Sequence, residues 1–257
     1  MLSSGVTVSG QGPLIVFLHS SLSSAKQWSN LARTLSSRFT CINIDLLGYG
    51  QAPKVIDQTH YCFDVEIVRI KQILQQVNAE SKFHLVGHSC GGAIALKMAV
   101  TAPENILSLS LYEPVAFHLF ESMNKSDEVK QFADKIANLD HITACKSFVD
   151  YWNGDGFFDA LPKPVQDNMV SNINKVNLDF KGIFAETYTL NDLERMTFPT
   201  VLCRGEYTTT ISAELSDNIA KHIHHAQLIK VKAGHMAPVS HPHLVEPIIE
   251  KFIEEQV

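Results

Sequence analysis

Long apolar runs are missing from this 257-residue chain. No stretch approaches the roughly 20 consecutive apolar residues that a membrane-spanning helix requires. The first residues, MLSSGVTVSGQGP, also lack the basic start and the apolar stretch of a signal peptide. These absences predict a cytoplasmic protein with no membrane partner.

The chain also has fewer basic than acidic residues. Lysine and arginine together number 21 against 27 aspartate and glutamate residues, which gives a net charge of -6. A nucleic-acid partner requires a basic face to meet its phosphates, so we expect none. Hydrophobic residues make up 45% and charged residues 19%, the composition of an ordinary globular protein. The length suffices for one domain with a large core, or for one domain with an insertion.

Cysteines are few and irregularly spaced. The chain has five, an odd number, and none is part of a Cys-x-x-Cys pair: Cys41, Cys62, Cys90, Cys145 and Cys203. This pattern favours reduced thiols over disulfides, and it argues against a zinc site. We expect neither a metal nor an organic cofactor.

Short apolar runs alternate with helix-like patterns along most of the chain. The runs predicted to be strands cover 13–19, 40–46, 83–88, 106–113, 200–205 and 226–232. The predicted helices cover 24–37, 62–77, 90–100, 212–224 and 243–254. Several strands are apolar at consecutive positions, which is typical of a parallel sheet covered on both faces. The alternation predicts an α/β fold with a doubly wound, mostly parallel sheet.

The alternation breaks once, between Pro114 and about Thr197. This stretch looks helical, contains eleven aromatic residues and has no clear strand pattern. We interpret residues 115–197 as a helical cap insertion, and residues 1–114 and 198–257 as the core domain. The aromatic content of the cap predicts that it covers an apolar substrate group.

The sequence LVGHSCGGAIALKMA changes from strand-like to helix-like around Ser89. Residues 87–91, GHSCG, fit the pattern G-x-S-x-G. Flanking glycines let a strand and a helix pack closely, and the strained turn projects the serine hydroxyl above the sheet edge. In this strand-turn-helix context we interpret Ser89 as a nucleophile.

A nucleophilic serine requires a base and an oxyanion site. His235, in KAGHMAPVSHP, follows the last predicted strand and is the predicted base among 12 histidines. The backbone N–H groups of Ser21 and Cys90 are the predicted oxyanion donors, because Ser21 follows the first apolar strand and Cys90 begins the helix after the serine. A simple serine-rich turn is the alternative interpretation for Ser21.

Taken together, these motifs give the chain a resemblance to the α/β-hydrolase superfamily over nearly its whole length. The matching pieces are FLHSS, DLLGYGQAP, GHSCGG, PTVLCRGE and AGHMAPVSHP. The family usually has His-Gly where this chain has His19-Ser20, so the Ser20 side chain could narrow the oxyanion loop. The motifs specify the superfamily, but they do not specify a substrate, because this fold hosts many chemistries.

The resemblance implies an acid between Ser89 and His235. Many members carry aspartate three residues after the glycine that ends the penultimate strand, where this chain has the neutral Thr208. Glu113, at the end of the preceding strand, is the favoured acid, and Glu206 is the alternative. Glu113 could also serve only as a strand-end residue. Glu66 is expected to favour the N-terminus of its helix through its charge.

The resemblance implies a serine hydrolase similar to carboxylesterases, acting on a small-molecule substrate. We expect cleavage of a small or medium apolar ester, thioester or lactone through an acyl-serine intermediate. A receptor-like binding protein with slow or single turnover is one alternative, and a carbon–carbon bond hydrolase or perhydrolase is another. Dehalogenases and epoxide hydrolases of this fold use aspartate where this chain has Ser89, which disfavours both. The sequence predicts no oligomeric state.

Overall fold

A seven-stranded sheet forms the centre of the computed structural model, which describes residues 2–77, 82–123 and 126–256. The strands are β1 (Val6–Ser9), β2 (Leu14–Leu18), β3 (Thr40–Ile44), β4 (Phe83–His88), β5 (Ile106–Tyr112), β6 (Thr200–Gly205) and β7 (Gln227–Val231). Their order across the sheet is β1-β3-β2-β4-β5-β6-β7. β1 is antiparallel to β3, and the other neighbours are parallel. The predicted fold class, a doubly wound and mostly parallel sheet, is confirmed.

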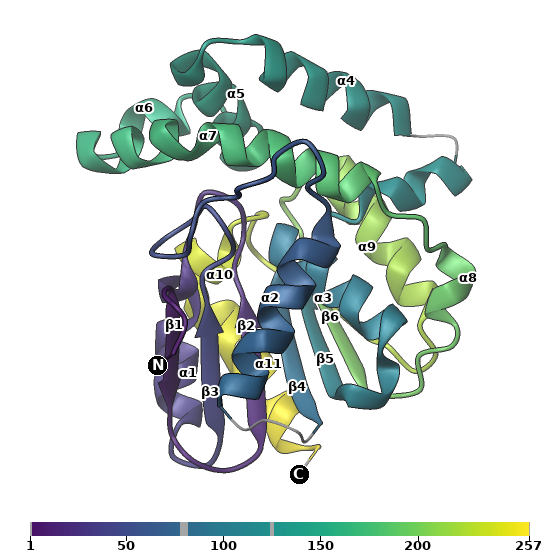
Figure 1. The fold of residues 1–257 in the computed structure, drawn as a ribbon. Helices are drawn as coiled ribbons and strands as arrows, with labels where there is room; N and C mark the ends of the chain where they lie inside the picture. The colour runs from purple at the N-terminus through teal and green to yellow at the C-terminus, as the bar shows by residue number, and fades with distance from the viewer. Residues whose placement is uncertain (1, 78–81, 124–125, 257) are drawn as a thin grey trace.

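Helices cover both faces of this sheet (Figure 1). One face packs against α2 (Phe63–Gln76), α3 (Cys90–Thr101) and α9 (Thr210–His222). The other face packs against α1 (Ser29–Leu35), α10 (Ala237–Ser240) and α11 (Pro242–Glu254). Two short 3-10 helices, η1 (Ala25–Trp28) and η2 (Pro103–Asn105), precede α1 and β5. Because the central strands are covered on both sides, most of their side chains are apolar on both faces, as the consecutive apolar runs predict.

The chain between β5 and β6 forms a separate layer of helices. We call residues 115–197 the helical segment; it contains η3 (Phe117–Met123), α4 (Ser126–Asn138), α5 (His141–Asn153), α6 (Phe157–Ala160), α7 (Lys163–Phe184) and α8 (Leu190–Leu193). Its described residues form no strand. α4 to α7 lie together across one end of the sheet (Figure 1). Whether the segment is a unit with the boundaries predicted from the sequence stays a prediction.

The pattern of apolar residues does not predict β1. This strand has four residues, and its two central side chains are exposed, so it carries no buried apolar run. It pairs with β3 at the edge of the sheet, between Val6 and Ile44 at one end and Ser9 and Cys41 at the other. Within residues 2–77, 82–123 and 126–256, no helix combines the length and the apolar composition needed to cross a membrane.

Candidate active site

Ser89 occupies a sharp turn between β4 and α3. Its backbone has φ +54° and ψ -118°, a conformation that residues with a Cβ rarely adopt. The two flanking glycines allow this turn. A Cβ on Gly87 would lie 2.7 Å from the carbonyl oxygen of Gly91, and one on Gly91 would lie 2.4 Å from that of His19. The GHSCG sequence therefore forms the tight strand-to-helix corner that the pattern predicts.

His235 lies between Ser89 and Glu113. Its Nε2 is 3.0 Å from Ser89 Oγ, and its Nδ1 is 2.6 Å from Glu113 Oε2. These contacts are satisfied when Nδ1–H donates to the carboxylate and Nε2 accepts the hydroxyl proton of Ser89. All three side chains are buried. The geometry is that of a nucleophile, a base and an orienting acid within hydrogen-bond reach of each other.

Two further groups hold the carboxylate of Glu113. The Gly205 N–H donates to Oε1 at 2.7 Å, and the Thr208 hydroxyl donates to Oε2 at 2.7 Å. Glu206, the alternative acid, has an exposed side chain, and its backbone N–H donates to the Val231 carbonyl. The structure thus brings Glu113 to His235 and leaves Glu206 at the surface. The contact made by Thr208 was missed in the sequence, where threonine was considered only as a missing acid.

The last residues of β4 and β5 donate hydrogen bonds to the backbone of the loop that carries His235. His88 Nε2–H donates to the His235 carbonyl at 2.9 Å, and the Tyr112 hydroxyl donates to the Gly234 carbonyl at 2.8 Å. Burial lowers the pKa of His88 well below its ordinary value, and the nearby His235 lowers it further. A neutral His88 therefore holds the backbone of His235 without placing a second positive charge beside it.

The helical segment closes over Ser89. Trp152, on α5, stacks on the His235 ring with 4.0 Å between ring centroids and 26° between planes. The cavity that remains has a volume of about 10 Å³, room for roughly one water molecule. Its lining is Ser21, Ser89, Val115, Phe117, Phe148, Trp152, Val176, Asp179, Phe180 and Ile183. Aromatic and aliphatic side chains from the helical segment therefore form most of the wall that faces the serine.

The two predicted oxyanion donors lie beside this cavity. Cys90 is the first residue of α3, where backbone N–H groups have no intrahelical acceptor, and Ser21 lines the cavity together with Ser89. The Ser20 hydroxyl donates to Gln27 Oε1 at 3.1 Å, so this side chain does not join the cavity lining. Burial raises the pKa of the Cys90 thiol well above its ordinary value, so the thiol stays protonated.

A second buried polar cluster adjoins the cavity. Lys175 and Asp179 on α7 form an ion pair, and Lys175 Nζ also lies 3.4 Å from Glu66 Oε1. Asp179 Oδ2 accepts hydrogen bonds from the hydroxyls of Ser21 and Tyr49, both at 2.6 Å. Burial lowers the pKa of Lys175, but the charges of Asp179 and Glu66 outweigh it and raise the pKa above its ordinary value.

The expectation for Glu66 was incomplete. Its side chain is fully buried and accepts hydrogen bonds from the Tyr61 hydroxyl at 2.8 Å and from the Leu47 N–H at 3.1 Å. Glu66 therefore binds partners from the neighbouring loop and from α7, in addition to lying in the first turn of α2. Lys175 and Asp179 were missed altogether, because a lysine and an aspartate four residues apart usually form a pair on an exposed helix face.

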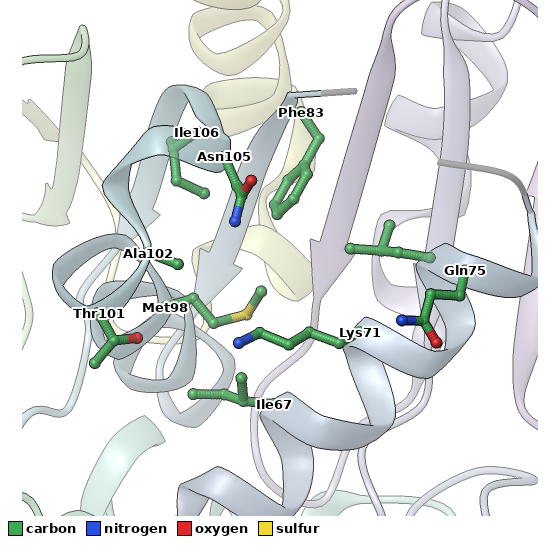
Figure 2. Close-up of a pocket in the computed structure, with 10 residues that line it drawn as sticks. Ile67, Lys71, Gln75, Phe83, Met98, Thr101, Ala102, Asn105 and Ile106 are labelled. Atoms are coloured by element: carbon green, nitrogen blue, oxygen red, sulfur yellow. The ribbon is translucent and has the colours of Figure 1, made fainter. Parts of the chain in front are cut away.

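A larger cavity lies at the other end of the sheet. It has a volume of about 460 Å³ and lies between α2 and α3, where Lys71, Met98 and Phe83 line it (Figure 2). Phe83 and Ile106 begin β4 and β5, whereas Ser89 and Glu113 follow the carboxyl ends of these strands. This cavity is therefore separate from the one beside Ser89. In the described part of the chain, no three His, Cys, Asp or Glu residues are grouped to hold a metal ion.

Comparisons with known proteins agree with the fold. Residues 13–141 match the family model described as alpha/beta hydrolase fold. The chain is 26% identical to a putative 2-succinyl-6-hydroxy-2,4-cyclohexadiene-1-carboxylate synthase from Bacillus subtilis, with 98% of this chain and 96% of that protein covered. A fluoroacetate dehalogenase from Burkholderia sp. is 30% identical over 122 residues, 46% of this chain, and the match spans only 40% of that protein.

Solved structures show the same similarity of fold. An esterase from Exiguobacterium antarcticum superposes with a TM-score of 0.78 at 19% identity, covering 99% of this chain and 100% of that one. An enol-lactonase from Burkholderia xenovorans gives a TM-score of 0.78 at 15% identity, with coverages of 98% and 96%. The matched family model and the shared sheet together show that this chain belongs to the α/β-hydrolase family and is a hydrolase of that fold.

Proposed function

We propose that this protein is a serine hydrolase that cleaves a small or medium apolar ester, thioester or lactone. The observation that carries the proposal is the position of His235, which bridges Ser89 and Glu113 at 3.0 and 2.6 Å. A serine, an imidazole and a carboxylate in this order transfer a proton from the attacking hydroxyl to the leaving group.

In the proposed mechanism, Ser89 Oγ attacks the substrate carbonyl carbon while His235 Nε2 takes the hydroxyl proton. The backbone N–H groups of Ser21 and Cys90 stabilise the negative charge that develops on the carbonyl oxygen. Collapse of the tetrahedral intermediate breaks the bond to the leaving group, which receives the proton from His235 and leaves an acyl-serine. Water, deprotonated by His235, then attacks the acyl carbon. The bond from that carbon to Ser89 Oγ breaks, His235 returns the proton to Oγ, and the carboxylic acid is released. Glu113 orients the imidazole and balances its positive charge throughout.

The shape of the cavity supports the substrate class. Its lining is mostly aromatic and aliphatic, and its volume of about 10 Å³ leaves no room for a large group while Trp152 lies on His235. Substrate entry therefore requires that side chains around the cavity, Trp152 among them, move aside, and small acyl groups require the least movement. The solved esterase and enol-lactonase with this fold are named for chemistry of the same kind.

A second candidate function is ligand binding with slow or single turnover. The small cavity beside Ser89 favours it, because a site with little room for exchange would release its product slowly. Cleavage of carbon–carbon bonds is a further possibility within the same chemistry, since a meta-cleavage product hydrolase from Pseudomonas fluorescens has this fold at a TM-score of 0.72.

Hydrolysis of p-nitrophenyl acetate and butyrate at pH 8 tests the proposal. Wild type is expected to release many equivalents of nitrophenol per protein. Ser89→Ala and His235→Ala each lower kcat by about 10⁵- to 10⁶-fold, as expected for members of one catalytic unit. Glu206→Gln is the matched control, because this carboxylate is exposed, and it leaves kcat unchanged. Release of one equivalent or none by wild type would instead support the binding function.

A further inference from the structure

We propose that Asp179 is a positioning residue for the oxyanion hole, and that it acts by holding Ser21 from the helical segment. The oxyanion donor on the loop after β2 is then fully assembled only while α7 lies over the sheet. This inference rests on the proposed function, in which the Ser21 N–H is one of the two donors.

The hydrogen bond between Ser21 and Asp179 joins two distant parts of the chain. Ser21 Oγ donates to Asp179 Oδ2 at 2.6 Å, across a separation of 158 residues. Both residues line the cavity that contains Ser89. A hydroxyl that donates to a carboxylate forms a short, charge-assisted bond, which orients the serine more strongly than a neutral acceptor would.

The residues that precede Ser21 are held by the core instead. His19 Nε2 accepts from the Leu46 N–H at 2.9 Å, and the His19 carbonyl accepts from the Gly91 N–H at 3.1 Å. The Ser20 hydroxyl donates to Gln27 at 3.1 Å. Ser21 is therefore the point at which this loop passes from core contacts to a contact with the helical segment.

Asp179 is itself fixed in place. Its side chain is buried, Lys175 pairs with Oδ1, and the Tyr49 hydroxyl donates to Oδ2 at 2.6 Å. Lys175 has a second role at this site. A lone carboxylate next to Ser21 would repel the negative charge that develops on the substrate oxygen, and the adjacent ammonium group offsets this repulsion. Asp179 can therefore orient Ser21 without opposing the reaction.

Movement of α7 and orientation of the donor are coupled as a result. Displacement of α7 from the sheet would separate Ser21 from its acceptor, and return of the helix would restore the hydrogen bond. Full stabilisation of the oxyanion then coincides with the closed cavity, where water is excluded and hydrogen bonds to a developing charge are strongest.

The test measures kcat and KM for p-nitrophenyl acetate in variants of both partners. Ser21→Ala is expected to lower kcat at least about 10-fold with KM changed less than about 2-fold, because the bond orients a group used in the transition state. Ser21→Thr keeps the hydroxyl and restores most of kcat. Asp179→Leu lowers kcat by a similar factor, and the double variant Ser21→Ala/Asp179→Leu is no slower than Asp179→Leu alone.

Ser171→Ala is the matched control, since it removes an exposed hydroxyl of the same helix, α7, that donates to the Asn168 carbonyl, and it leaves kcat within about 2-fold. An unchanged kcat in Ser21→Ala, or independent losses that multiply in the double variant, would overturn the positioning role. If Asp179→Leu does not fold, the comparison of Ser21→Ala with Ser21→Thr decides the question, because it alters one hydroxyl. A wild type without turnover, or an active Ser89→Ala, contradicts the proposed function itself.

Discussion

Two buried carboxylates adjoin Ser89, and their partners differ in kind. Glu113, at the end of β5, binds a histidine, a backbone N–H and a threonine hydroxyl. Asp179, on α7, binds a lysine and two hydroxyls. An imidazole gains and loses a proton near neutral pH, whereas the pKa of Lys175 is raised by the charges of Asp179 and Glu66. In the proposed mechanism, the partner of each carboxylate, and not its burial, decides whether the carboxylate orients the base or the loop that carries an oxyanion donor.

Replacing the two carboxylates by their amides gives the largest expected difference. Glu113→Gln should lower kcat for p-nitrophenyl acetate by about 10⁴-fold, the effect of losing the orienting acid in a serine protease. Asp179→Asn keeps an oxygen that accepts the Ser21 hydroxyl, and it should lower kcat less than 10-fold. Steady-state kinetics on both variants makes the comparison. Equal losses would show that the two carboxylates act alike.

Removing the lysine tests the structural half of the comparison. Lys175→Met leaves Asp179 and Glu66 buried without their cation, which should lower the free energy of unfolding by about 3–5 kcal/mol. Urea denaturation measures the loss. Lys163→Met on the same helix is the matched control, because Lys163 forms an exposed ion pair with Asp167, and its loss should cost less than about 1 kcal/mol. Similar values for both variants would contradict the buried role of Lys175.

Acid should affect buried groups of the core and of the helical segment differently. Lys175 stays charged as pH decreases. A buried histidine of the core is held neutral, so protonation of the same histidine in the unfolded chain favours unfolding. Burial lowers the pKa of His84 from 6.5 to about 4. Between these values the unfolded chain binds a proton that folded His84 does not, so the free energy of unfolding falls as pH decreases from 6.5 to 4, by up to about 3 kcal/mol for this residue.

Urea denaturation of His84→Gln and wild type between pH 6.5 and 4 measures how much His84 contributes to this decrease in the free energy of unfolding. The variant should lose less stability on acidification than wild type does. His60→Gln serves as the control, because His60 is exposed. An identical pH dependence in His84→Gln and wild type would remove His84 as a source of acid sensitivity.

The position of Thr208 offers a way to move the acid. Thr208 Oγ1 lies 2.7 Å from the oxygen of Glu113 that contacts His235, so an aspartate there brings a carboxylate close to Nδ1. The double variant Glu113→Gln/Thr208→Asp should regain about 10²-fold in kcat over Glu113→Gln, part of the loss expected for the missing acid. Glu113→Gln/Thr208→Asn has the same shape without the charge and should regain nothing. Equal rates for the two double variants would show that charge at this position does not reach His235.

Among the changes to Glu113 and its partners, removing the Thr208 hydroxyl has the smallest expected effect on kcat. Thr208→Val is nearly isosteric and deprives Glu113 of one hydrogen bond, so kcat should fall about 10-fold, or about 1.4 kcal/mol in the barrier. Thr208→Ser retains the donor and should stay near the wild-type rate. A Thr208→Val variant with the wild-type kcat would leave the Gly205 N–H as the main support of Glu113.

Local sequence features predicted the sharp turn at Ser89 and nominated His235, whose role as the base stays a prediction. The turn at Ser89 and the histidine after β7 are encoded by neighbouring residues, and consecutive apolar residues identify the parallel strands. Glu113 and Glu206 could be proposed, but choosing between them required knowing which side chain is buried beside His235. The Lys175 cluster was not predictable, because its partners Glu66, Tyr49 and Ser21 are more than 100 residues away in the sequence.

The hydrogen bond from the Gly205 N–H to Glu113 joins the carboxyl ends of β5 and β6, the two strands between which the helical segment is inserted. The chain leaves the sheet at Glu113 and returns in β6, which pairs with β5 from Leu109 and Thr200 onwards. The segment leaves at the carboxyl end of β5 and returns at the amino end of β6, so it is the crossover that joins two neighbouring parallel strands. Doubling its length would cost only about 0.6 kcal/mol in loop closure. Residues 115–197 can therefore be lengthened or exchanged at little cost in loop closure, while the Glu113 carboxylate stays attached to the same two strands.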